Sequence, residues 1–292
     1  MRTQFIETVS SVFNENENVV LLLGDIGVYG FRTLLEKFPK RALNIGILEQ
    51  ATVSVAAGMS MSGLIPIVHT IAPFLIERAF EQIKIDFGYQ KLSGNLVSVG
   101  ASYDYAALGC THHCPGDVAL LQTIPGAQII VPGHKKEFDY LFKSNYNNTM
   151  LSYFRLSELS NDIHFKLDYN RAKVVKTGSR AVIVVVGPLL SRVLEASREY
   201  DVTVIYYNTV SPFDSETLYK NVTYGQKIIS IVPFYESTIT HKIIRSVCGK
   251  VSDVRAIGVP IEFADNYGSA AEHDNKFGLD VNSLKVRIGA IL

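Results

Sequence analysis

Asn44-Ile45-Gly46-Ile47-Leu48-Glu49-Gln50 is the stretch that decides the fold, because a short apolar strand ends there in a single carboxylate at the start of a following helix. We expect Glu49 to be buried without a cationic neighbour. An isolated buried carboxylate is costly to ionise and is suited to sharing a proton with a heterocyclic nitrogen. The alternative is structural, since an acid in a first helical turn also favours the positive end of the helix dipole.

The composition indicates a compact protein without a strong electric field. The chain has 292 residues, of which 47% are hydrophobic, and this length corresponds to about two domains. Its 28 basic and 28 acidic residues leave no net charge. We therefore expect no nucleic-acid partner and no attraction to an anionic membrane.

The location of the protein is predicted from what the sequence lacks. No apolar run reaches the roughly 20 residues that a membrane span needs, and Met1 to Glu7 carries an acid where a signal peptide would be apolar. Three cysteines, Cys110, Cys114 and Cys248, cannot form a disulfide framework and fit a reducing compartment. We expect a cytoplasmic protein.

Short apolar runs alternate with helical patterns along the whole chain, which predicts an α/β fold with mostly parallel sheets flanked by helices. Expected strands are 18–23, 42–47, 65–68, 95–99, 128–131, 150–155, 181–186, 202–207, 227–232 and 254–259. Expected helices are 51–62, 73–89, 117–123, 135–146 and 189–200.

A polar, weakly periodic segment between Ser157 and Gly178 interrupts this alternation and contains the turn formers Leu159 to Asp162. We place a domain boundary there. The prediction is a first domain over residues 1–160 and a smaller α/β domain over residues 174–292.

Several separated motifs resemble the pyrimidine-binding domain of the transketolase family. They are Gly46 to Gln50, Val55 to Gly58, Thr70 to Leu75, Arg78 to Ile83 and Thr111 to His113, in the family's order and approximate spacing. The whole chain resembles the separately encoded C-terminal subunit of a split transketolase. The resemblance implies a thiamine-diphosphate pyrimidine-binding domain followed by a transketolase C-terminal-like domain.

By this resemblance, Glu49 is catalytic and hydrogen-bonds N1′ of the aminopyrimidine of thiamine diphosphate. Phe74 takes the family position that stacks on that ring, as an aromatic face can do. Periodicity alone would place Phe74 on the buried face of an amphipathic helix, as part of the hydrophobic core. Asp25, at the carboxyl end of the first strand, aligns beside the thiazolium, although a plain Asx turn would also explain it.

The segment from Cys110 to Cys114 carries two adjacent histidines between two cysteines. Zinc prefers such ligands, but no second Cys/His pair lies at zinc-finger distance, so we expect no metal site in this chain. A polar loop without a ligand is the other alternative. The family resemblance implies that His112 contacts substrate oxygens as a catalytic residue, with His113 as a weaker candidate.

Departures from ordinary transketolases gather where that family holds the distal phosphate of the sugar. They are Tyr29, Gly100, Leu108, Gly116 and Glu158. A glutamate repels phosphate at a place where arginine would bind it, so we expect an unusual sugar, for example a nucleotide-linked one. Arg155 lies close by in the sequence and is the residue that could take over a phosphate.

The sequence contains no Gly-Asp-Gly segment followed by an asparagine, the family pattern that ligates magnesium and the diphosphate. The resemblance therefore implies a partner, the N-terminal transketolase subunit with the pyrophosphate-binding domain, which also ligates Mg²⁺ or Ca²⁺. Self-association into an α2β2 assembly follows from the same pattern. The expected function is transfer of a two-carbon ketol unit between sugars, with activity only in the presence of that partner.

Two other functions stay open at this stage. One is the β subunit of a 2-oxo acid dehydrogenase, which shares the two-domain plan but matches the segments around Phe74 and His112 less well. The other is a non-catalytic scaffold subunit that has lost its substrate pocket. The retained Glu49 argues against a scaffold.

Overall fold

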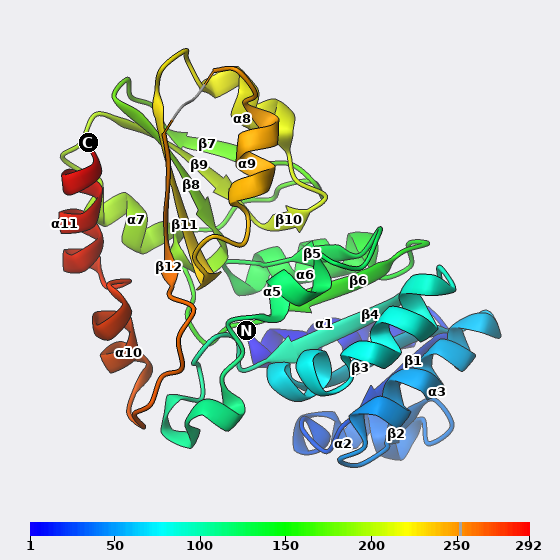
Figure 1. Ribbon diagram of the computed structural model, residues 1–292. Coiled ribbons are helices and arrows are strands. Elements are labelled where there is room, and N and C mark those ends of the chain that lie inside the picture. Colours follow the sequence, from blue (N-terminus) through cyan, green and yellow to red (C-terminus); the bar gives the residue numbers. More distant parts are fainter. Residues whose placement is uncertain (251–252) are drawn as a thin grey trace.

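The computed structural model describes residues 1–250 and 253–292 and contains two sheets, each flanked by helices (Figure 1). The first half of the chain forms most of a seven-stranded sheet, and the second half forms a five-stranded sheet. This architecture confirms the expected α/β fold with two mostly parallel sheets.

The seven-stranded sheet has the strand order β10-β5-β6-β4-β3-β1-β2, and all neighbours are parallel except β10, which pairs antiparallel with β5. Its strands are β1 (Val19–Leu23), β2 (Ala42–Asn44), β3 (Ile65–Ile71), β4 (Gly94–Val99), β5 (Gln128–Ile130), β6 (Leu151–Arg155) and β10 (Thr209–Ser211).

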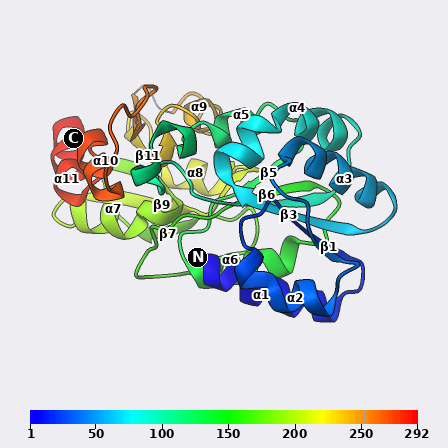
Figure 2. The same ribbon diagram turned by 90° about the horizontal axis from the view of Figure 1, so that it is seen from below.

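Helices cover both faces of this sheet, as Figure 2 shows from below. On one face lie α1 (Arg2–Glu15), α2 (Val28–Lys37) and α6 (Lys135–Asn145). On the other lie α3 (Glu49–Met61), η1 (Pro73–Arg78), α4 (Phe80–Gln82), η2 (Ile83–Tyr89) and α5 (Asp117–Leu121). Because both faces are covered, β1 and β4 are buried at every position, as the continuous apolar sequence of β1 predicts.

The five-stranded sheet has the order β12-β11-β8-β9-β7, with only the edge strand β7 antiparallel. Its strands are β7 (Lys173–Lys176), β8 (Ala181–Val186), β9 (Val202–Tyr207), β11 (Lys227–Tyr235) and β12 (Val254–Val259). Its helices are α7 (Leu190–Ala196), α8 (Ser215–Asn221), α9 (Thr240–Ser246), α10 (Ala270–Phe277) and α11 (Val281–Ile291). Short 3₁₀ turns complete the secondary structure at η3 (Ala106–Leu108), η4 (Cys110–His112) and η5 (Gly187–Leu189).

The expected helix over residues 73–89 forms, but it is not a uniform α-helix. It consists of two π-helical segments, η1 and η2, joined by the single turn of α4. Periodicity detects the buried face of such a segment but not the extra residue that widens each turn. The antiparallel strands β7 and β10 were not among the expected elements, and neither were the helices α1, α2, α8, α9, α10 and α11.

The two halves of the chain share structure. Strand β10 comes from the second half of the sequence but joins the first sheet through Thr209 and Ser211. One apolar cluster also continues from the first half into the second, through residues such as Val53, Ile129, Val184 and Leu218. The domain boundary expected between residues 160 and 174 stays a prediction.

Within the described residues, no helix is both long and apolar enough to cross a membrane.

His69 gives the fold a pH dependence that can be measured. Its ring is completely buried in β3, with Nδ1 2.8 Å from the carbonyl oxygen of Val97 and with Phe5 packed at a ring distance of 4.4 Å. Burial lowers the pKa of His69 from its ordinary value of 6.5 to about 4. The unfolded chain therefore binds a proton between pH 6.5 and pH 4 that the folded chain does not bind.

We predict that this group alone lowers the free energy of unfolding by about 3 kcal/mol as the pH falls from 7 to 4. Urea denaturation across this range, compared between the wild type and His69→Met, measures the contribution. The variant should lose stability less steeply on acidification, whatever its stability at pH 7. Equal pH slopes for the two proteins would contradict the prediction.

Candidate active site

The turn between β2 and α3 is shaped by Asn44 and Gly46. Gly46 has a φ of 85°, a left-handed conformation that glycine adopts without steric cost. The side-chain oxygen of Asn44 accepts hydrogen bonds from the backbone N–H of Gly46 at 3.1 Å and of Asp25 at 3.0 Å. One amide side chain thus joins the loop after β1 to the start of α3.

Asp25 lies in the left-handed region as well, with a φ of 64°. Aspartate tolerates this region better than most residues. Its carboxylate accepts a hydrogen bond from Asn44 Nδ2 at 3.2 Å, and the side chain is exposed at the carboxyl end of β1. Asp25 is therefore connected, through Asn44, to the turn that leads to Glu49.

Glu49 opens α3 and is only 2% exposed. The expectation that it lacks a cationic neighbour is wrong, because Arg78 Nη1 donates to Glu49 Oε2 at 2.9 Å. Arg78 belongs to the separate segment η1, which folds back beside α3. No local sequence pattern around Glu49 indicates this partner.

Arg78 also contacts Phe74, one helical turn earlier on the same segment. The Arg78 guanidinium carbon lies 4.2 Å from the centre of the half-buried Phe74 ring, which is the geometry of a cation–π contact. The edge of the Phe74 ring in turn meets the ring of His112, with centroids 5.1 Å apart and planes at 72°. Glu49, Arg78, Phe74 and His112 thus form one continuous group, here called the Glu49 cluster.

His112 is held by the short turn η4, which follows the left-handed Gly109. Its Nδ1 lies 3.0 Å from Thr111 Oγ1, which leaves Nε2 available to a ligand. His113 lies apart from the Glu49 cluster, buried with its ring 5.3 Å from that of His273 in α10. Burial and the neighbouring His273 lower the pKa of His113.

Arg155 lies in a different environment from the Glu49 cluster. It is buried at the end of β6, and its Nε donates to Asp117 Oδ2 at 2.7 Å. The same guanidinium donates to Ser102 Oγ at 2.8 Å. Asp117 therefore already neutralises the charge with which Arg155 was expected to bind phosphate.

The cysteines and histidines of the 110–114 segment diverge in the structure. Cys110 is exposed, whereas Cys114 is buried, and burial raises the pKa of the Cys114 thiol. Across residues 1–250 and 253–292 there is no cluster of three or more His, Cys, Asp or Glu side chains that could hold a metal ion.

The structure shows the surroundings of the positions that depart from the family pattern. Gly100 has a φ of 75°, and a Cβ atom there would lie 2.5 Å from the ring of Tyr105, so the tyrosine occupies the room of a side chain at position 100. The backbone N–H of Glu158 donates to Asp104. Tyr29 and Leu108 are both exposed.

The sequence-based reasoning gave Arg78 no role in the site. One signal could have found it, because Arg78 follows Phe74 by four residues on an expected helix, where side chains meet.

Known proteins are similar to this chain in both sequence and fold. A family model described as the pyrimidine-binding domain of transketolase matches residues 1–161. An uncharacterised 33.6 kDa protein of the fasciation locus of Rhodococcoides fascians is 35% identical over 295 residues, which cover 100% of this chain and 95% of that protein. A protein of Phocaeicola vulgatus, named as one subunit of an apulose-4-phosphate transketolase, is 25% identical and covers 96% of this chain and 93% of the relative.

Solved structures agree on the fold. A split-gene transketolase, described as an inactive β4 tetramer, has a TM-score of 0.83 at 24% identity and matches 99% of this chain and 96% of its own. The transketolase of Campylobacter jejuni has a TM-score of 0.81 at 17% identity and matches 99% of this chain but 46% of its own. The chain belongs to the transketolase pyrimidine-binding family and has the organisation of the C-terminal subunit of a split, thiamine-diphosphate-dependent transketolase.

Proposed function

We propose that this chain is one subunit of an enzyme that transfers a two-carbon ketol unit between sugars, and that it is active only with a partner subunit. The observation that carries the proposal is the Glu49 cluster, in which a buried carboxylate, an aromatic face and an imidazole are brought together from three separate segments. This is the set of groups that the family resemblance implies.

The cluster is suited to the cofactor of the family. The Arg78 guanidinium is flat, donates an N–H to Glu49 and lies over the ring of Phe74. An aminopyrimidine is also flat and also carries N–H donors. The Arg78 guanidinium therefore makes the two contacts that an aminopyrimidine ring would make, a hydrogen bond to Glu49 and a face contact with Phe74. This supports the fit of the aminopyrimidine of thiamine diphosphate to these two residues.

When bound, thiamine diphosphate supplies a carbon nucleophile and an electron sink for breaking a carbon–carbon bond next to a carbonyl. Glu49 would hold a proton at ring nitrogen N1′, with water excluded by its burial. Phe74 would orient the ring by stacking. His112 would exchange a proton with a substrate oxygen through Nε2, and Asp25 would lie beside the thiazolium.

The sugar is proposed to differ from the simple sugar phosphates of ordinary transketolases. Support comes from Glu158, which places an acid where phosphate would be held, and from Arg155, whose charge is paired with Asp117. A larger sugar, such as a nucleotide-linked one, is the substrate class that we infer.

The partner is proposed to be a subunit with the pyrophosphate-binding domain, which would hold the diphosphate and its Mg²⁺ or Ca²⁺ ion. Two relatives are named as subunits of an apulose-4-phosphate transketolase, and this name supports an enzyme built from more than one kind of chain. An α2β2 assembly would place the Glu49 cluster at the seam between chains.

Replacing Glu49 with glutamine should reduce turnover by roughly two orders of magnitude or more, because an amide cannot hold the proton. The assay is release of CO₂ from hydroxypyruvate, a minimal two-carbon donor, by the chain mixed with its partner. Glu81→Gln, an exposed acid on the adjacent turn, is the matched control and should keep full activity. Near-normal turnover by a folded Glu49→Gln protein would remove Glu49 from the mechanism.

Replacing Arg78 with alanine should lower the free energy of unfolding by about 1 kcal/mol, since it leaves a buried carboxylate without its donor. The expected change is modest because the arginine side chain is 39% exposed. Arg32→Ala removes a similar guanidinium–aromatic contact, over Tyr29, and should change stability by less than about 0.5 kcal/mol. Equal urea midpoints for the two variants would show that Arg78 does not stabilise Glu49.

Thiamine diphosphate should bind only to the assembled subunits. Calorimetric titration of the cofactor with Mg²⁺ is expected to give no heat with the chain alone and a saturable signal after the partner is added. The signal should weaken at least tenfold with Phe74→Ala, which removes the stacking face. Tight binding to the isolated chain would contradict the proposed division of the site.

A further inference from the structure

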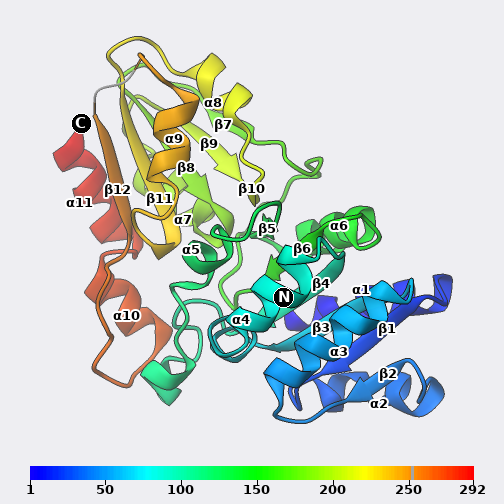
Figure 3. The same cartoon turned by 45° about the vertical axis from the view of Figure 1, so that its right-hand side comes forward.

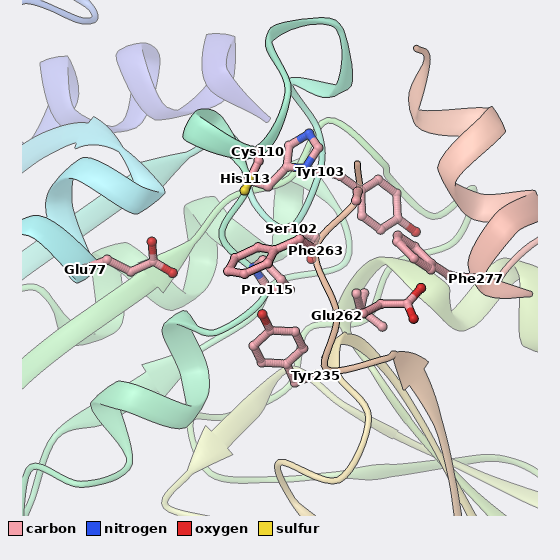
Figure 4. A pocket seen from close by; sticks show the side chains of 12 residues that line it. Glu77, Ser102, Tyr103, Cys110, His113, Pro115, Tyr235, Glu262, Phe263 and Phe277 are labelled. Carbon is pink, nitrogen blue, oxygen red and sulfur yellow. The ribbon is translucent and has the colours of Figure 1, made fainter. Parts of the chain in front are cut away.

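A cavity of about 140 Å³ lies between the two halves of the chain, next to the His112 turn (Figure 4). Cys110 and His113, which flank Thr111 and His112, contribute one wall. The cavity is also lined by Tyr235 at the end of β11 and by Glu262 and Phe263, which follow β12. The volume is several times the roughly 30 Å³ that one water molecule occupies in the liquid, so the cavity admits a small organic ring.

Two segments contribute residues to both the cavity and the Glu49 cluster. The His112 turn supplies His113 to the cavity and His112 to the cluster, and η1 supplies Glu77 to the cavity and Arg78 to the cluster. The segment after β12 also reaches the His112 turn, because a Cβ atom on Gly109 would lie 2.6 Å from the ring of Tyr267. Figures 1 and 3 both show this segment running alongside the 106–112 loop.

The polar groups that line the cavity are hydrogen-bond acceptors and weak acids. Two of them are the carboxylates of Glu77 and Glu262. A third polar residue of the lining is His113, which is 8% exposed. No lysine or arginine is among the described residues that line the cavity. Phosphate is thereby disfavoured, whereas hydroxyl groups can donate to the two carboxylates.

The apolar part of the lining includes aromatic rings. Tyr235 lies across the cavity from His113 with Phe263 between them, and Phe263 is 79% exposed (Figure 4). A ring with an apolar C–H face and hydroxyl groups at its edge matches aromatic faces combined with a few polar groups.

Gly116 leaves the floor of the cavity open. A Cβ atom at this position would lie 3.2 Å from Tyr235 Cε2 and 3.6 Å from Glu77 Oε1, both of which line the cavity. Gly116 is also one of the positions at which the sequence departs from ordinary transketolases. A side chain at position 116 would therefore contact two residues that line the cavity, and glycine avoids these contacts.

We propose that this cavity binds an uncharged sugar ring of the substrate, away from the reacting carbonyl, so that the second half of the chain determines substrate choice through Glu262 and Phe263. The inference rests on the proposed function, because it assigns the ring to a substrate of that enzyme. It names the chemical class of the group as a non-phosphorylated pyranose or furanose.

The protonation of the lining supports this assignment. Burial raises the pKa of Glu77, and burial together with His273 lowers the pKa of His113. A neutral imidazole adds no positive charge to the lining, which again disfavours phosphate.

Saturation-transfer NMR with the full-length chain, alone and with its partner, tests the proposal. The probes are the methyl pyranosides of glucose, galactose and N-acetylglucosamine, with inorganic phosphate as a competitor. At least one glycoside should give a signal that phosphate does not displace. The signal should fall at least fivefold in Phe263→Ala, in Glu262→Gln and in Gly116→Ala, which fills the floor.

Ile261→Ala is the matched control, because Ile261 is an equally exposed apolar residue on the same segment that does not line the cavity. It should retain the signal. Phe263 is exposed, so its truncation should not unfold the chain.

Three results would overturn the proposal. They are no signal from any of the three glycosides, a signal that survives all three cavity variants, and a weaker association of Phe263→Ala with the partner subunit while the sugar signal persists. The last result would make the segment a docking surface instead. Failure of the proposed function is recognised separately, by absence of hydroxypyruvate turnover in the wild-type assembly.

Discussion

The pairing of Glu49 with Arg78 is the interaction on which the rest of the candidate site depends. A carboxylate with 2% exposure would be too costly to keep at the start of α3 without a cation or a hydrogen-bond donor. Arg78 supplies both, and its contact with Phe74 brings the aromatic ring into the same group. The edge of that ring then meets His112, so one ion pair organises side chains from three segments.

Much of the first sheet could be predicted from the sequence, because its strands are short, mostly apolar runs between helical patterns. β1, β3 and β4 begin within one residue of their expected starts. The short antiparallel strands β7 and β10 could not be predicted, because three or four residues carry little periodic signal and their pairing is decided by distant strands. The π-helical turns of η1 and η2 could not be predicted either, since their apolar face resembles that of an α-helix.

The site was only partly predictable. Motifs predicted Glu49, Phe74 and His112 as site residues, and the structure brings Phe74 into contact with His112 and joins it to Glu49 through Arg78. Arg78 was missed as a partner of Glu49 because the two are 29 positions apart and meet only after η1 folds beside α3. The cavity behind His113 was beyond reach for the same reason, since Glu77 and Phe263 come from opposite halves of the chain.

The position of β10 has a mechanical consequence. This strand belongs by sequence to the second half but pairs with β5 in the first sheet. Backbone hydrogen bonds as well as apolar packing therefore connect the two halves. A hinge motion between the two halves would have to break the backbone hydrogen bonds between β10 and β5. We therefore expect the two halves to move as one body when the chain meets a neighbouring protein.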